Sequence, residues 1–257
     1  MIERSEPAAG IVLLTLNRPP ANALSPELLG ALADALGAAV QDRARAIVIA
    51  GQPGMFSAGL DVPLLLTLDR AAMDDFWRTF FGVLRALARS PVSVGMAITG
   101  HCPAGGTVLA LFADYRIAAV GDFKLGLNEV QVGLPMPSLV FGAFRRLLGA
   151  HAAEQLAVSA GLITPEEALA VGLVDAVAPV DQVVARAVER AMTLAALPAA
   201  ALAGTRALAR ADLMALFDGL DGSTYAGMNE VWFGAETQAA MRALVARLAE
   251  RRATHSR

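Results

Sequence analysis

The sequence predicts an α/β fold with a largely parallel sheet, followed by a helical region. Short β-branched runs alternate with segments of helical periodicity as far as Asp122, which is typical of right-handed βαβ units. From Pro137 onward most segments have helical spacing, and several end at glycines such as Gly149, Gly161 and Gly172. A chain of 257 residues could hold one or two domains, but no linker or repeat separates a second one.

The elements before residue 100 follow from local patterns. Apolar runs at residues 11–16, 44–51 and 91–99 read as buried strands. Ser25, followed by a proline and a glutamate, is typical of a helix start, and leucines at helical spacing follow it. Residues 73–89 carry an aromatic-rich apolar stripe, which predicts a helix packed in the core.

A glycine pair, Gly105 and Gly106, lies between the predicted strand at 91–99 and a short apolar run, TVLALFA, that predicts a buried helix. Unpaired backbone N–H groups at such a helix start can bind developing negative charge. A tight connection without chemistry explains the same pattern, because glycine is common wherever the backbone turns sharply.

Glu129 is a lone carboxylate in the apolar segment LGLNEVQVGLP. In an apolar pocket, desolvation would raise its pKa and make it a better proton acceptor near neutral pH. A solvated loop carboxylate is the alternative.

Three ordered motifs carry a family resemblance. HCPAGGTVLALFADYRIA followed by LGLNEVQVG resembles the crotonase (enoyl-CoA hydratase/isomerase) superfamily, and within it the mitochondrial-type Δ3,Δ2-enoyl-CoA isomerases. LNRPPANALS at Leu16–Ser25 and MFSAGLD at Met55–Asp61 extend the resemblance over nearly the whole chain. It implies a crotonase-like spiral of ββα repeats in residues 1–195, followed by a C-terminal helical region in residues 196–257.

The resemblance assigns roles to individual residues. The N–H groups of Leu60 and Gly105 would form an oxyanion hole for the thioester oxygen, and Glu129 would carry a proton from C2 to C4. The loop at residues 51–61 could otherwise be an ordinary βα connection. The residues expected to bind the CoA thioester are Arg18, Ala58, Asp61 and Gly106, with Arg18 a candidate for the phosphates by position only.

Val108 distinguishes the branches of the family that the sequence resembles. It stands at the position where hydratases of that family have their first catalytic glutamate. Hydration needs two carboxylates, whereas isomerisation needs water kept out. We therefore expect a 3-enoyl-CoA to 2-trans-enoyl-CoA isomerase of fatty acid β-oxidation, with coenzyme A as part of the substrate and no further cofactor. The alternatives are an enoyl-CoA hydratase, another crotonase-type acyl-CoA reaction, or a non-enzymatic CoA- or RNA-binding protein.

The amino-acid composition limits the kinds of binding partner that the protein could have. A hydrophobic share of 56% with only 18% charged residues suggests surface buried between subunits, and the resemblance implies a homotrimer or a dimer of trimers. The net charge of −3 and a single lysine, Lys124, argue against nucleic-acid binding.

Other classes of site are not expected. Cys102 is the only cysteine, which excludes an internal disulfide, and His101, His151 and His255 lack ligand-like spacing, so we predict no metal. Prolines and glycines divide the uncharged stretch 90–113, which argues against a membrane span. No basic-plus-apolar leader is visible, so the expected location is cytoplasmic.

Overall fold

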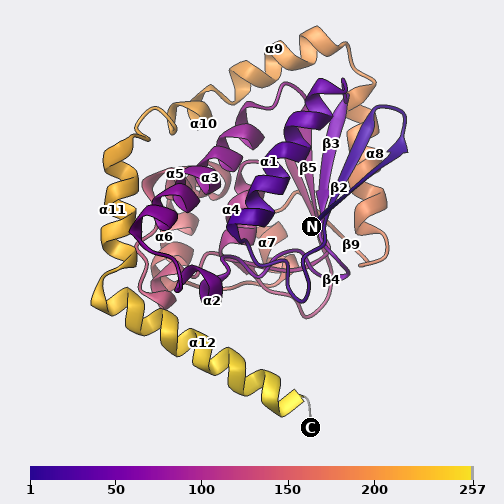
Figure 1. Ribbon diagram of the computed structural model, residues 1–257. Helices are drawn as coiled ribbons and strands as arrows, with labels where there is room; N and C mark the ends of the chain where they lie inside the picture. The colour runs from indigo at the N-terminus through magenta and orange to yellow at the C-terminus, as the bar shows by residue number, and fades with distance from the viewer. Residues whose placement is uncertain (256–257) are drawn as a thin grey trace.

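The computed structural model describes residues 1–255, with side chains described through residue 250. Its centre is a six-stranded sheet with strand order β1-β2-β3-β5-β7-β9 (Figure 1). The first two strands are antiparallel and each later strand runs parallel to its neighbour. The strands are β1 (Ile2–Ala8), β2 (Ile11–Leu16), β3 (Ala46–Ala50), β5 (Ser93–Ile98), β7 (Tyr115–Ala119) and β9 (Ala176–Ala178). The predicted α/β fold with a largely parallel sheet is confirmed.

Helices cover both faces of this sheet. The helix α8 (Val183–Ala195) packs on one face, against Ala46, Val48 and the other strand residues that point the same way. The alternate residues, such as Ile47, enter the larger core on the other face. That core contains α1 (Pro26–Gln41), α3 (Arg70–Arg89) and α4 (Gly105–Leu111).

The starts of two long helices follow from capping side chains. Ser25 Oγ accepts a hydrogen bond from the Leu28 N–H at 3.2 Å, as expected for the cap of α1. Asp69 Oδ1 accepts one from the Ala72 N–H at 2.9 Å and begins α3. The aromatic stripe of α3 is buried, which confirms the predicted core helix.

A second, three-stranded sheet holds β4 (Gly54–Met55), β6 (Gly100–Pro103) and β8 (Leu125–Gly126), all parallel. Each of these short strands follows a strand of the large sheet, so the chain repeats two strands and then a helical segment. This is the predicted spiral of ββα repeats. It brings the segments that leave β4, β6 and β8 to the same edge of the small sheet.

The remaining helices surround this body. They are α2 (Val62–Leu65), the 3₁₀ helix η1 (Glu129–Val132), α5 (Ser138–Leu148), α6 (Ala150–Ser159), α7 (Pro165–Ala170), α9 (Ala199–Ala209), α10 (Ala211–Ala215), α11 (Gly222–Trp232) and α12 (Ala235–His255). From α9 to α12 the chain runs around the outside, and the end of α12 projects from the body (Figure 1). The predicted division after residue 195 coincides with the end of α8 and stays a prediction as a domain boundary.

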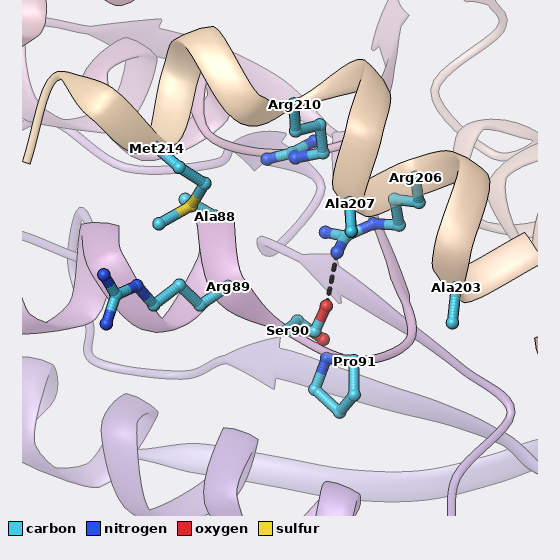
Figure 2. Close-up of a pocket in the computed structure, with 9 residues that line it drawn as sticks. All are labelled: Ala88, Arg89, Ser90, Pro91, Ala203, Arg206, Ala207, Arg210 and Met214. Carbon is cyan, nitrogen blue, oxygen red and sulfur yellow. Dashed lines mark hydrogen bonds between the residues drawn. The ribbon is translucent and has the colours of Figure 1, made fainter.

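Asp114 anchors the outer helices to the core. Its Oδ1 accepts hydrogen bonds from Arg206 Nε at 2.7 Å and Arg210 Nη1 at 2.8 Å, and its Oδ2 accepts one from the Val94 N–H at 2.7 Å. Arg206 also donates to the carbonyl of Ser90 at the end of α3, beside a cavity of about 370 Å³ (Figure 2). We call Asp114, Arg206 and Arg210 the arginine latch.

Asp114 and Arg116, which are close in the sequence, do not form an ion pair with each other. Arg116 instead pairs with Asp175 at 2.9 Å and donates to the carbonyl oxygens of Ala110 and Ala113. Each of these two charged residues ties a different distant segment to the end of α4.

In the described part of the chain, no single helix is long and apolar enough to cross a membrane. Only α8 and α9 taken together, which are bent relative to each other, reach that length and apolar character.

Candidate active site

Two loops meet at the edge of the small sheet and bring Leu60 and Gly105 together. A Cβ atom built on Gly105 would lie 3.4 Å from the Leu60 nitrogen, and one built on Gly59 would lie 3.1 Å from the Gly105 nitrogen. Gly59 has φ +85°, which favours glycine, so a side chain there would be strained as well as crowded. The two amides predicted as an oxyanion hole are therefore neighbours.

The Leu60 N–H is left unpaired by the way its loop is held. Leu60 forms a parallel bridge with Leu24, in which the Leu24 N–H donates to Gly59 O at 2.8 Å and the Asp61 N–H donates to Leu24 O at 3.1 Å. In such a bridge the amide of Leu60 itself points to the opposite side. Leu24 lies in the LNRPPANALS motif, but no sequence pattern marks it as the residue that supports this loop.

The Gly105 N–H is unpaired because it opens α4, where the first amides have no partner within the helix. The preceding residue, Ala104, gives no side-chain cap and has φ 49°, an uncommon conformation for a residue with a Cβ atom. Within the described residues neither Leu60 nor Gly105 donates a backbone hydrogen bond. Two unpaired donors thus lie side by side.

Glu129 opens η1 after the small sheet. As a residue it is only half-buried, but its Oε2 atom is fully buried and has no hydrogen-bond partner among the described residues. Burial raises the pKa of Glu129 to about 7, against a smaller lowering by its own backbone N–H. Leu127 and Leu134, both buried, flank the segment. Of the two alternatives for Glu129, a desolvated or a solvated carboxylate, the buried Oε2 atom fits the first.

Backbone and helix contacts fix the Glu129 segment. The Ala104 N–H donates to Gly126 O at 2.8 Å, which joins the start of α4 to β8. On the other side Thr237 Oγ1, from α12, donates to Gly133 O at 2.6 Å. The C-terminal helix therefore packs on the segment that carries the carboxylate.

Val108 lies within the first turn and a half of α4 and is 3% exposed. Its N–H donates to Ala104 O at 2.9 Å, so its side chain is held on the same short helix that begins with Gly105. A valine adds no lone pair and no proton donor to the site. Among the residues predicted to be catalytic, Glu129 is the only carboxylate.

The residues predicted to bind CoA have structural partners. Arg18 Nη2 contacts Asp61 Oδ2 at 2.5 Å, and Arg18 Nη1 donates to Ala23 O at 3.1 Å. Asp61 Oδ1 also accepts the Leu64 N–H at the start of α2. This places Arg18 beside the loop that carries Leu60, but its contact with phosphates stays a prediction.

Ala58 and Gly106 also belong to these loops. Ala58 is exposed, and its N–H donates to Ala21 O at 2.9 Å. A Cβ atom on Gly106 would lie 2.8 Å from Ser57 O, so glycine is needed there for close backbone packing. The assigned roles in substrate binding stay predictions. Within the described residues, no group of three or more His, Cys, Asp or Glu side chains could hold a metal ion.

Comparison with known proteins shows which family the chain belongs to. Residues 6–250 match the enoyl-CoA hydratase/isomerase family. The chain is 35% identical over 205 residues to human mitochondrial enoyl-CoA delta isomerase 1, covering 79% of this chain and 68% of that protein. It is 36% identical to the probable enoyl-CoA hydratase echA17 of Mycobacterium avium, covering 68% of each.

The same relationship holds in three dimensions. The crystal structure of human mitochondrial delta3-delta2-enoyl-CoA isomerase superposes with a TM-score of 0.93 and 30% identity, over 97% of this chain and 98% of that one. The spiral of ββα repeats, the ordered motifs and these similarities lead to one conclusion: the chain belongs to the enoyl-CoA hydratase/isomerase family and has the crotonase fold.

Proposed function

We propose that the protein is an enoyl-CoA isomerase, which shifts the double bond of a 3-enoyl-CoA to the conjugated 2-trans-enoyl-CoA in fatty acid β-oxidation. The observation that carries this proposal is the combination of two unpaired amides, at Leu60 and Gly105, with one buried carboxylate, Glu129. The similarity to the human isomerase supports the same reaction.

The chemistry requires one base and two donors. Ionised Glu129 removes a proton from C2, and the electron pair of that C–H bond moves toward the thioester, whose oxygen becomes negative. The N–H groups of Leu60 and Gly105 stabilise that oxygen, each by about 3 kcal/mol in the transition state. The protonated carboxyl then returns its proton to C4 as the double bond forms between C2 and C3. No atom is gained or lost.

The electrostatics of Glu129 suit both steps. A pKa of about 7 makes the carboxylate a stronger base than an exposed glutamate, while the conjugate acid still returns its proton readily near neutral pH. The absence of a hydrogen-bond partner on Oε2 leaves that oxygen available to the substrate. Coenzyme A belongs to the substrate, and the mechanism uses no further cofactor.

Val108 favours isomerisation over hydration. A hydratase of this family needs a second carboxylate to hold the attacking water, and a buried valine occupies that place. An apolar side chain also keeps water from the enolate. Relatives described as probable hydratases are nevertheless similar, so hydration is the competing reaction to measure.

We also propose that the protein acts as a homotrimer or a dimer of trimers. The support is α9, an alanine- and leucine-rich helix whose apolar residues are mostly exposed, with Leu208 80% exposed. Apolar surface of this kind is normally covered by another element or another subunit. Light scattering at micromolar concentration tests the assembly, and a stable monomer would contradict it.

The deciding experiment follows the conjugated thioester. Purified protein is incubated with a series of 3-enoyl-CoA substrates of increasing chain length, and the absorbance of the 2-enoyl thioester is recorded. Hydration of the corresponding 2-enoyl-CoA is measured in parallel. We expect isomerisation to be much the faster reaction. Failure to conjugate any member of the series, with intact binding of the thioesters, would overturn the proposed function.

A further inference from the structure

Thr107 contacts both the strand that leads to Gly105 and the strand that leads to Glu129. It is the third residue of α4, two residues after Gly105, and it is 1% exposed. Its Oγ1 donates a hydrogen bond to Cys102 O and accepts one from the Gly126 N–H at 2.9 Å. One hydroxyl therefore contacts α4, β6 and β8 together.

The two backbone groups lie where β6 pairs with β8. These strands are parallel, with Cys102 opposite Leu125 and Pro103 opposite Gly126. In this register the Gly126 N–H faces the Cys102 carbonyl. The Thr107 hydroxyl bridges these two groups, because it accepts a hydrogen bond from the Gly126 N–H and donates one to the Cys102 carbonyl.

After one further hydrogen bond, from the Ala104 N–H to Gly126 O, the two chains continue to different predicted catalytic groups. One chain continues from β6 through Ala104 to the unpaired Gly105 amide. The other leaves β8 at Gly126, which has φ +127°, and reaches Glu129 three residues later. The chain segments that lead to Gly105 and to Glu129 are therefore joined to each other by the hydroxyl.

The hydroxyl makes both contacts, because the hydroxyl of serine or threonine can donate one hydrogen bond and accept another. Cys102 Sγ, 4.0 Å from Thr107 Oγ1, is a weak alternative partner. Buried hydrogen bonds of this kind rigidify the groups that they join. Displacing a catalytic group by about 1 Å can cost about 100-fold in rate.

We propose that Thr107 is a positioning residue that sets the placement of Glu129 relative to the Leu60 and Gly105 amides. This inference rests on the proposed function, since it assigns the carboxylate and the amides to one reaction. Thr107 acts through the backbone of the two strands and does not itself touch the substrate.

The first test compares Thr107→Val, which keeps the shape and removes the hydroxyl, with Thr107→Ser, which keeps the hydroxyl. With a 3-enoyl-CoA substrate, kcat of the valine variant should fall at least about 10-fold with KM within about twofold, because binding is retained while geometry is lost. The serine variant should recover most of kcat. Thr193→Val is the matched control, since its exposed hydroxyl donates to a carbonyl of its own helix, Glu189 O.

The second test does not depend on turnover. Amide hydrogen exchange is measured on peptides that cover residues 120–135, together with the unfolding temperature. The valine variant should lose protection at the Gly126 amide, whereas the serine and Thr193→Val variants should not. Equal protection of Gly126 in wild type and the Thr107→Val variant would overturn the inference, as would unchanged kcat or a serine variant no better than valine.

The two proposals can fail separately. If the wild type does not isomerise any 3-enoyl-CoA, the proposed function fails, and with it the assignment of Glu129 and the amides to that reaction. If the wild type is active but loss of the Thr107 hydroxyl lowers only the unfolding temperature, then Thr107 is structural and the positioning role is wrong.

Discussion

The amide nitrogen of Leu60 faces the space that a side chain on Gly105 would fill, because a Cβ atom built on Gly105 lies 3.4 Å from that nitrogen. The same Cβ atom would lie 2.9 Å from the terminal methyl Cδ1 of Leu24, which can move. The fold can therefore accept a methyl group at Gly105, whereas the space between the two amides cannot accept both a methyl group and a thioester oxygen.

We predict that Gly105→Ala lowers kcat/KM for 3-enoyl-CoA by about 100-fold or more while the protein stays folded, since the added methyl group keeps the thioester oxygen from the two donors, and an oxyanion-hole donor is worth about that much. Steady-state kinetics and circular dichroism measure the two effects. Gly82→Ala is the control, because a Cβ atom there meets nothing within 4 Å and an exposed helix position should gain about 0.5–1 kcal/mol. Near wild-type activity of the Gly105 variant would exclude its amide from the oxyanion hole.

We predict that Glu129→Gln abolishes isomerisation but preserves the fold and thioester binding. The amide keeps the shape of the side chain and cannot accept a proton at useful pH. Glu154→Gln, at an exposed position of α6, serves as the control. Activity is compared under single-turnover conditions and binding by calorimetry. If the Glu129 variant keeps activity within about tenfold of wild type, another group is the base, since a positioned base contributes about 100-fold or more.

The raised pKa of Glu129 also predicts a pH dependence of stability. The folded protein holds the proton up to about pH 7, whereas the unfolded chain loses it near the ordinary value of 4.5. The folded state therefore binds more protons between these values, and the free energy of unfolding should fall as pH rises through this window, by about 3 kcal/mol in total. Above pH 7 the cost is constant.

Glu129→Gln removes this cost, so the variant should be more stable than wild type above pH 7 and nearly equal to it near pH 4.5. Urea unfolding at pH 4.5, 6 and 8, compared with Glu154→Gln, measures the difference. Parallel stability curves for wild type and the Glu129 variant across this range would show that the carboxyl group ionises normally in the folded protein.

The arginine latch leads to a prediction about the free energy of unfolding. Asp114→Asn removes the negative charge that Arg206 and Arg210 share, and both guanidinium groups are largely buried. We expect a loss of about 3 kcal/mol in the free energy of unfolding, because a buried cation is left without its counterion. Asp122→Asn, which is exposed, should change little. An unfolding midpoint equal to wild type for Asp114→Asn would remove the latch as a stabilising feature.

Much of this fold could be predicted because the large sheet and its helices have strong apolar periodicity. The strand β1 was not predicted, since its residues IERSEPA are mostly exposed and gain their strand conformation from antiparallel pairing with β2. The strands β4 and β8 have two residues each, too few for any pattern. They follow from tertiary pairing alone, yet they bring the catalytic loops together.

The candidate site was predicted from motifs more than from physics. The sequence marked Glu129 as a lone acid among apolar residues, and its buried Oε2 agrees with that. The arginine latch could not be predicted, because more than ninety positions separate Asp114 from its partners. One signal existed: Arg206 is the only charged residue of the otherwise alanine- and leucine-rich helix α9.

We finally predict that the wild type hydrates 2-enoyl-CoA far more slowly than it isomerises 3-enoyl-CoA, and that Val108→Glu raises hydration. The missing acid/base partner is worth about 2 to 4 powers of ten. The gain should be partial, because the new carboxylate enters a site where valine is 3% exposed and is penalised by desolvation. Some loss of stability should accompany it.

The ratio of the hydration rate to the isomerisation rate is measured on wild type, Val108→Glu and Val108→Gln. Because glutamine has nearly the same shape as glutamate but no charge, the two variants separate the effect of charge from that of shape. Glutamine fills the same volume and can hold a water, but it cannot exchange a proton, so only the glutamate variant should gain hydration. Equal gains in both variants would mean that space rather than acid/base chemistry limits hydration. A wild type that already hydrates as fast as it isomerises would show that Glu129 alone supports both reactions, and the argument from Val108 would then be wrong.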